Sequence, residues 1–279
     1  MMRYIFLILI GYVVIYPLLY MVCNSVKTQY AFLDVSRLWI PKSITFDKFK
    51  EIWEMGGFDA AIVKTLTVQI SSAFLEVVSC SFAGYAMARF NYKLKKFESV
   101  LVIFALLIPV QMYSLALSVT YRNIGIFDSP FVYILPSLFG VGVRGGMIIF
   151  IYRQFFEGLP KELEEAAYVD GAGPLKTFFS IAIPSSGVVI LTVSVLSFIW
   201  HWNESYLADL CFVSGNRPLA SAMGALREVL QYRGFFLGKP EYPAYISAGC
   251  LLFVIIPLVL YMIFQRRFVR SIDRVGITG

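Results

Sequence analysis

Residues 4–23 read YIFLILIGYVVIYPLLYMVC, an apolar run that contains no charged side chain. Roughly 20 helical residues cross the hydrocarbon core of a bilayer, which is about 30 Å thick. The run is too long for the hydrophobic segment of a signal peptide, and no small-x-small cleavage pattern follows it. The stretch therefore predicts a retained transmembrane helix near the start of the chain.

Five more apolar stretches of similar length follow the first one. They lie at about 65–88, 99–119, 131–152, 185–203 and 244–264. The chain is 58% hydrophobic and 15% charged, so its 279 residues carry too few polar side chains to cover a water-soluble globule. The sequence predicts an all-α, polytopic membrane protein of about six transmembrane helices, organised as a single permease domain over 1–279.

Two basic clusters orient these helices. They are Arg89, Lys93, Lys95 and Lys96 after the second stretch, and Arg266, Arg267, Arg270 and Arg274 after the sixth. Positive residues next to membrane spans mark the cytoplasmic side. An even number of spans places both termini and the segment 157–184 on that side of a bacterial cytoplasmic membrane. The net charge of +6 is explained by this orientation and does not indicate a nucleic-acid partner.

The residues needed for a metal site or for ATP hydrolysis are not grouped in this sequence. The four cysteines, Cys23, Cys80, Cys211 and Cys250, stand singly and far apart, and His201 is the only histidine. Metal-ligand spacing is therefore absent. The phosphate-loop pattern G-x-x-x-x-G-K-[ST] does not occur either. We expect neither a metal nor a cofactor in this chain, and a membrane-embedded enzyme has little to build on.

The polar segment 157–184 predicts two short helices joined by a glycine turn. Pro160 suits the start of a helix, and Gly171 can adopt the left-handed conformation that ends one. Three acidic residues near the positive end of the helix dipole support the same start: Glu162, Glu164 and Glu165. These signals alone also fit an ordinary amphipathic connection.

The spacing of residues inside this segment is more specific. In order they are Glu165-Ala166-Ala167, three residues, Gly171, nine residues, Ile181, one residue, and Ile183-Pro184. This spacing resembles the EAA loop of ATP-binding-cassette (ABC) importer permeases, in which leucine is usual where this chain has Ile183. Other stretches resemble the carbohydrate-uptake, MalG-like members of that binding-protein-dependent family. These are Gly84–Phe90, Ile108-Pro109, Arg153–Phe156, Trp202-Asn203 and Gln265–Val269.

The resemblance implies a cytoplasmic coupling helix that docks in a cleft of a separate ATPase. By position, Glu165 would make polar docking contacts, Ala166 and Ala167 would pack closely, and Gly171 would form the turn. Asp170 is a further docking candidate, although a solvated helix end explains it equally well.

The resemblance also implies the other components of the transporter. These are a second, MalF-like permease, two ATP-binding subunits that hold ATP and Mg, an extracytoplasmic solute-binding protein, and a sugar substrate. An ion-coupled secondary transporter is the alternative. It would need intramembrane acids for ion coupling, and Glu76 is nearly alone in that position.

Four residues in or beside the spans are candidates for the translocation path. An ionisable group at membrane depth is costly, which singles out Glu76 and Arg144. Glu76 fits a permeation path, a contact with the second permease, or a hydrogen bond within the bundle, and Arg144 fits a gate or a water-accessible helix break. Trp202 and Asn203 fit a sugar path, while the aromatic belt of the membrane interface is the simpler explanation of the tryptophan.

Overall fold

The computed structural model describes residues 2–33, 39–41, 43–213 and 217–276, with side chains described as far as Gln265 in the last helix. These residues form helices and their connections, and the one β-type pairing among them is an isolated bridge between Lys27 and Ile44. The all-α fold class is therefore confirmed for this part of the chain. The chain divides into two compact units, Met1–Val63 with Pro218–Val259, and Lys64–Arg217 with Leu260–Gly279. The single domain over 1–279 stays a prediction.

The first unit contains the helices of both ends of the chain. They are α1 (Met2–Ser25), η1 (Gln29–Phe32), α2 (Asp47–Met55), α3 (Phe58–Lys64), α14 (Leu219–Tyr232) and the first part of α15 (Tyr242–Gly276). The Lys48 ammonium of α2 lies 3.8 Å from the Glu241 carboxylate and 4.8 Å from the centre of the Tyr245 ring. The Tyr245 hydroxyl donates a hydrogen bond to Glu51. These contacts fix α2 against the start of α15.

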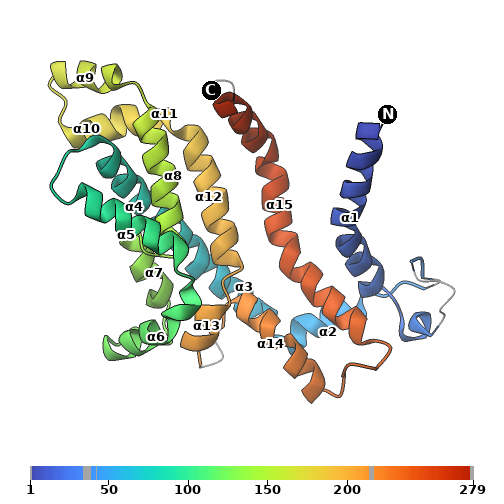
Figure 1. Ribbon diagram of the computed structural model, residues 1–279. Helices are drawn as coiled ribbons and strands as arrows, with labels where there is room; N and C mark the ends of the chain where they lie inside the picture. Colours follow the sequence, from blue (N-terminus) through green and yellow to red (C-terminus); the bar gives the residue numbers. More distant parts are fainter. Residues whose placement is uncertain (1, 34–38, 42, 214–216, 277–279) are drawn as a thin grey trace. The chain divides into compact units, whose positions relative to one another are not determined.

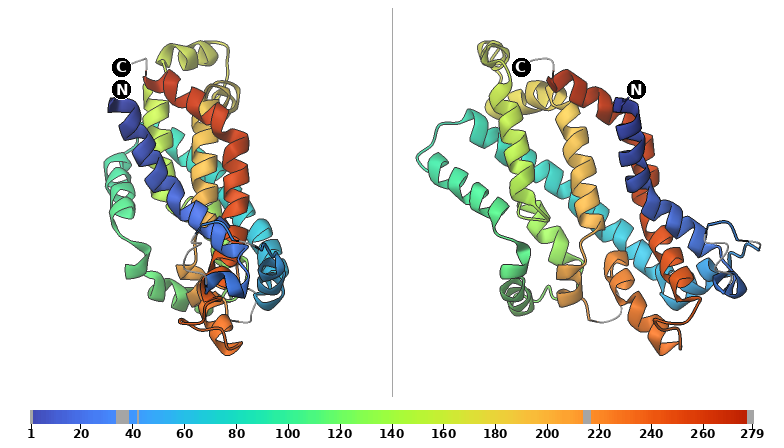
Figure 2. Two further views of the ribbon diagram at one scale, coloured as in Figure 1. Left: turned by 90° about the vertical axis from the view of Figure 1, so that its right-hand side faces the viewer. Right: turned by 45° about the vertical axis from the view of Figure 1, so that its right-hand side comes forward.

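The second unit is built around α4 (Ile70–Arg89), which continues a π-helical turn, η2 (Thr65–Gln69). The helices after α4 are α5 (Lys95–Leu107), η3 (Val110–Met112), α6 (Ser114–Asn123), α7 (Phe131–Leu138) and α8 (Gly145–Gly158). Then come α9 (Lys161–Val169), α10 (Pro174–Thr177), η4 (Phe178–Ala182), α11 (Ile183–Ser185), α12 (Gly187–Trp202) and α13 (Tyr206–Cys211). α4 packs against α7, α8 and α12, which lie beside it in Figures 1 and 2.

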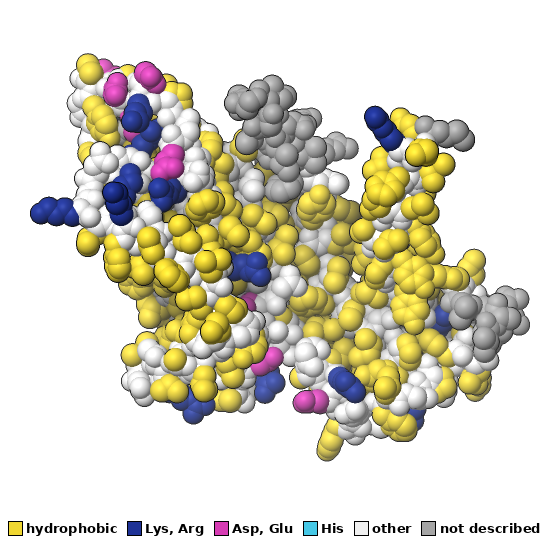
Figure 3. Space-filling model, in the orientation of Figure 1, with side chains coloured by type: hydrophobic (Ala, Val, Ile, Leu, Met, Phe, Trp, Pro, Cys, Tyr) yellow, Lys and Arg dark blue, Asp and Glu magenta, His cyan; other side chains and the backbone are white. Residues whose placement is uncertain are grey.

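Hydrophobic side chains cover the middle of the second unit. Figure 3 shows charged side chains gathered at the end that carries α9 and again near α6 and α13, with a hydrophobic surface between them. On α5, for example, Leu101, Ile103 and Phe104 are exposed. A band of this kind is expected where lipid replaces water as the solvent.

Three of the six predicted spans coincide with single helices of the required length and composition, and a fourth coincides with a bent pair of helices. Three single helices are long and apolar enough to cross a membrane: Met2–Ser25, Phe58–Arg89 and Tyr242–Gln265. They contain the predicted spans 4–23, 65–88 and 244–264. The pair Pro174–Ser185 and Gly187–Trp202, bent by 81°, passes the same test jointly and accounts for 185–203.

The spans 99–119 and 131–152 are wrong as continuous helices. The first breaks at Ile108-Pro109, where Ile108 is extended (ψ 115°) because proline disfavours a helical residue before it. The second breaks between α7 and α8, where Gly140 and Arg144 have φ of 72° and 60°. None of the four pieces, α5, α6, α7 and α8, is long enough to span a membrane alone. The count of six crossings therefore stays a prediction.

Gly84 allows α4 and α8 to approach closely. A Cβ atom added at Gly84 would lie 2.5 Å from the Cβ of Tyr152 and 3.0 Å from the backbone nitrogen of Arg153. Next to this contact, Tyr85 and Phe156 meet edge to face at 5.3 Å between ring centroids. The packing of α4 on α8 therefore requires a residue without a side chain at position 84.

We expect Gly84→Ala to destabilise the protein by about 1–3 kcal/mol, because the added methyl group has no space between the two helices. Fluorescence-detected size-exclusion chromatography after heating, in detergent, measures the loss. Gly158→Ala is the matched control, since a Cβ at Gly158 of α8 meets no atom within 4 Å. Equal melting midpoints for both variants would show that the close approach is not needed.

Candidate functional site

The segment with the EAA-like spacing forms a helix, α9, as predicted, and this helix ends in a defined cap. It begins after Pro160, and Gly171 follows it with φ of 78°. The Gly171 N–H donates to the Tyr168 carbonyl at 3.0 Å, and the Ala172 N–H donates to the Ala167 carbonyl at 2.9 Å. This is the Schellman arrangement, in which the left-handed residue is usually glycine. The role predicted for Gly171 as the turn residue therefore has a structural basis.

The residues predicted to dock on an ATPase lie on the outer side of α9. Glu165, Ala166, Asp170 and Gly171 are exposed, and Ala167 is half-buried. The adjacent alanines leave the helix backbone open to close approach by another surface. Their docking role stays a prediction.

The opposite side of α9 carries a contact that the sequence analysis missed. The Glu164 carboxylate accepts a hydrogen bond from Nε of Arg89, at the end of α4, at 2.9 Å. A second guanidinium nitrogen of Arg89 donates to the Leu159 carbonyl at 2.7 Å. The two side chains are only 6% and 8% exposed. From sequence, Arg89 marked the cytoplasmic side and Glu164 supported the start of a helix, and neither signal reveals that they pair.

Aromatic side chains form a packed layer next to this ion pair. Phe178 of η4 stacks on Phe82 of α4 with 4.6 Å between ring centroids, and it lies 5.0 Å from Tyr85. Tyr85 in turn meets Phe156 of α8. Ring contacts thus hold together the C-terminal ends of α4 and α8 and the turn η4.

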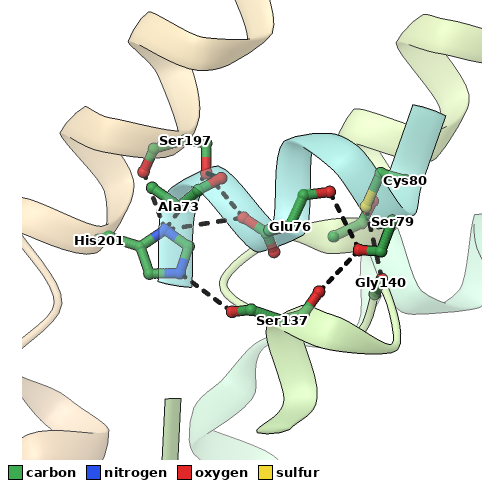
Figure 4. A network of polar contacts seen from close by, with 9 residues as sticks. Ala73, Glu76, Ser79, Cys80, Ser137, Gly140, Ser197 and His201 are labelled. Carbon is green, nitrogen blue, oxygen red and sulfur yellow. Dashed lines mark hydrogen bonds and ion pairs between the residues drawn. The ribbon is translucent and has the colours of Figure 1, made fainter. Parts of the chain in front are cut away.

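A second polar site lies deep in the apolar part of the unit, where Glu76 of α4 is fully buried (Figure 4). One carboxylate oxygen, Oε2, accepts a hydrogen bond from Ser197 of α12 at 2.8 Å and lies 3.6 Å from Nδ1 of His201. His201 Nδ1 is 2.9 Å from the Ser197 carbonyl oxygen, which can only accept, so Nδ1 carries the hydrogen. His201 Nε2 faces the Ser137 hydroxyl of α7 at 3.5 Å.

The other carboxylate oxygen of Glu76 faces the break between α7 and α8. A Cβ added at Gly142 would lie 2.6 Å from Oε1, and one at Gly145 would lie 3.3 Å from it. Ser79 donates from α4 to the Ser137 carbonyl at 2.6 Å and secures the same break. Of the three interpretations of Glu76, the structure therefore favours hydrogen bonding within the bundle.

The remaining candidates for the translocation path do not come together with Glu76. Arg144 is exposed at the start of α8, with its guanidinium 5.3 Å from the centre of the Trp200 ring. Trp202 is 1% exposed and packs against Phe198, so its face is not available for a sugar ring in this chain. Asn203 is exposed, and its amide donates to the Ile199 carbonyl at 2.8 Å.

Glu204 and Tyr92 are among the titratable groups outside the spans whose pKa values are shifted. Burial raises the pKa of the Glu204 carboxyl, which follows α12 directly. Burial and a hydrogen bond to Glu98 raise the pKa of Tyr92 to about 12, so this tyrosine is neutral at physiological pH.

Comparison with known proteins places this architecture. The family described as "Binding-protein-dependent transport system inner membrane component" matches residues 81–274. The alpha-glucoside transport system permease protein AglG of Rhizobium meliloti is 27% identical over 241 residues, which cover 86% of this chain and 62% of that protein. The trehalose transport system permease protein SugB of Mycobacterium tuberculosis is 28% identical, covering 98% of this chain and 95% of that one.

A solved structure shares the fold. It is the crystal structure of a bacterial ABC transporter involved in the import of the acidic polysaccharide alginate, which aligns with a TM-score of 0.79 and 17% identity. The alignment covers 96% of this chain and 95% of the matched chain. The family match spans well over half of the sequence and includes α9 together with both partners of its ion pair. This chain is a multi-pass membrane protein that belongs to the binding-protein-dependent transport system inner membrane components, the permease family of ABC importers.

Proposed function

We propose that this chain is one of two permease subunits of an ATP-driven importer whose cargo is a sugar or an oligosaccharide. The geometry of α9 is the observation that carries the proposal. This helix of nine residues is capped by Gly171, exposes its EAA-like residues, and buries only Glu164. A helix that is anchored on one side and free on the other is suited to docking on a separate protein.

The docking surface consists of Glu165, Ala166, Ala167 and Asp170 on α9, with Gly171 ending the helix. The small side chains admit close packing, and the exposed carboxylates accept hydrogen bonds from the ATPase. Two ATP-binding subunits supply ATP and Mg, because the sequence has no phosphate loop of its own. A MalF-like permease completes the membrane part of the complex.

The remaining components follow from the same proposal. A solute-binding protein delivers the cargo on the outer side of a bacterial inner membrane, and both termini lie in the cytoplasm. The names of AglG and SugB, an alpha-glucoside and a trehalose permease, support a sugar as cargo. Asn203 and Arg144 are the exposed polar side chains of this chain that we assign to the path, while the partner permease provides the aromatic face that buried Trp202 does not.

Family membership argues against the ion-coupled secondary transporter, and uptake measurements separate the two functions. We expect deletion of this chain in its native host to abolish ATP-dependent uptake of one radiolabelled sugar, either trehalose or another alpha-glucoside. Uptake of labelled glycine serves as the control and remains unchanged. Sugar uptake that persists in ATP-depleted vesicles and follows an imposed ion gradient would contradict the importer.

A second prediction concerns the cap of α9. We expect Gly171→Pro to leave the chain inserted in the membrane but to abolish the ATPase stimulation by loaded solute-binding protein in the assembled complex. Proline fixes φ near −65°, whereas Gly171 has φ of 78°, and proline lacks the N–H that Gly171 donates to Tyr168. The substitution therefore removes the cap and displaces the docking surface.

Gly173→Pro provides the matched control two residues away. Gly173 has φ of −76° and ψ of 170°, values that proline tolerates, and the space around its Cβ position is open. We expect stimulated ATP hydrolysis to stay within about twofold of wild type in this variant. Equal stimulation in both proline variants would show that the cap of α9 is not part of coupling.

A further inference from the structure

We propose that the Arg89–Glu164 ion pair is a rigid link that makes α9 and α4 move as one body. Arg89 and Glu164 are then positioning residues for coupling. This inference rests on the proposed function and names the residues through which movement of the docking helix reaches the bundle. Glu164 and its neighbour Glu165 then have opposite tasks. Glu165 faces outward to the partner, and Glu164 faces inward to the permease.

The way α9 is attached supports this assignment. Glu164 is the only buried residue among Lys161–Val169, whereas the large apolar side chains of the helix, Leu163 and Val169, are 46% and 88% exposed. Short amphipathic helices normally bury apolar residues against the protein. Here the buried contact is a charged hydrogen bond instead, and Tyr168, one turn further on the same face, lies near Tyr85 of α4.

The geometry of the pair fixes the orientation of α9 as well as its distance from the end of α4. The planar guanidinium of Arg89 donates along two edges, to the Glu164 carboxylate and to the Leu159 carbonyl between α8 and α9. One side chain from the end of α4 therefore holds both the start of α9 and the residue that leads into it. Both charged groups are buried, so removing either leaves the other without its partner in a poorly solvated place.

A neighbouring ion pair of similar geometry, which joins two residues of one helix, serves as the comparison. Arg153 and Glu157 lie one turn apart on α8, with 2.8 Å between Nε and Oε1. Their side chains are 24% and 36% exposed, and the bond connects two residues of the same helix. Glu157→Gln therefore matches Glu164→Gln in chemistry and bond length, but the bond that it alters lies within α8, and the separate bond from Arg153 to the Ser99 hydroxyl of α5, 2.8 Å long, does not involve Glu157.

The test uses spin labels in the complex purified through a tag on this chain and placed in lipid nanodiscs. The labels replace two exposed residues, Val169 at the end of α9 and Asn91 just after α4. Electron paramagnetic resonance gives the distance between them with and without ATP plus vanadate. The variants are Glu164→Gln, the charge exchange Arg89→Glu with Glu164→Arg, and the control Glu157→Gln.

We expect wild type and Glu157→Gln to keep one narrow distance that ATP plus vanadate does not change. In Glu164→Gln we expect a distribution at least twofold wider and a nucleotide-dependent shift of about 2 Å, the scale of helix shifts in switching proteins. A purely structural role would widen the distribution without making it respond to nucleotide. The charge exchange should give a narrower distance distribution than Glu164→Gln but a wider one than wild type, because it rebuilds the ion pair with the opposite polarity and loses the bond from Arg89 to the Leu159 carbonyl.

An unchanged narrow distance distribution in Glu164→Gln would overturn the proposal. So would a distribution in the charge-exchange variant that is no narrower than the one in Glu164→Gln. If Glu164→Gln lowers the yield of complex, the distance is measured on the assembled fraction, and the same two outcomes decide. The proposed function fails in a different way, namely when no ATPase subunit purifies with the wild-type chain. In that case the distance distribution without nucleotide still tests whether Glu164 holds α9 against α4.

Discussion

Polar groups inside a membrane protein find their partners within the protein, because lipid offers them no hydrogen bonds, and α4 has to satisfy two ionisable side chains under this rule. One carboxylate oxygen of Glu76 accepts a hydrogen bond from Ser197 of α12, and the other lies against the glycines between α7 and α8. Arg89, at the C-terminal end of the same helix, donates hydrogen bonds to Glu164 of α9 and to the Leu159 carbonyl just before that helix. Partners from distant parts of the chain therefore converge on one helix.

Polar contacts explain how the helices of the second unit keep their places although several of them are interrupted. The break before α8 contains Gly140 and Arg144 in left-handed conformations, and α12 is bent away from the preceding helices by 81°. Interruptions of this kind free backbone groups that lipid cannot satisfy. The hydrogen bond from Ser79 of α4 to the Ser137 carbonyl holds this region against α4, and the Ser137 hydroxyl faces Nε2 of His201 of α12.

Local signals in the sequence predicted the parts of the site that depend on local chemistry. Pro160 and Gly171 place the two ends of α9 correctly, because a helix start and a left-handed cap need particular residues at particular positions. The apolar runs likewise locate α1, α4 and α15. The continuous spans 99–119 and 131–152 failed, because hydropathy averaged over a window does not register a proline or a glycine that breaks the helix.

Contacts between residues far apart in sequence were not accessible in the same way. His201 served only to exclude a metal cluster, yet its ring lies beside Glu76, 125 positions earlier in the numbering. Trp202 is apolar packing rather than a sugar platform in this chain, because it faces Phe198. A single sequence gives the side-chain types and their spacing, but the pairing of Arg89 with Glu164 depends on how α4, α8 and α9 meet in space.

Chemical labelling tests most directly whether the outer face of α9 is the surface on which the ATPase docks. A cysteine introduced at exposed Glu165 is treated with a membrane-impermeant maleimide in inverted vesicles, before and after urea removes peripheral subunits. The account predicts slow labelling while the ATPase is bound, fast labelling after it is stripped, and none from outside intact cells. Labelling from outside intact cells, or equal rates with and without the ATPase, would contradict it.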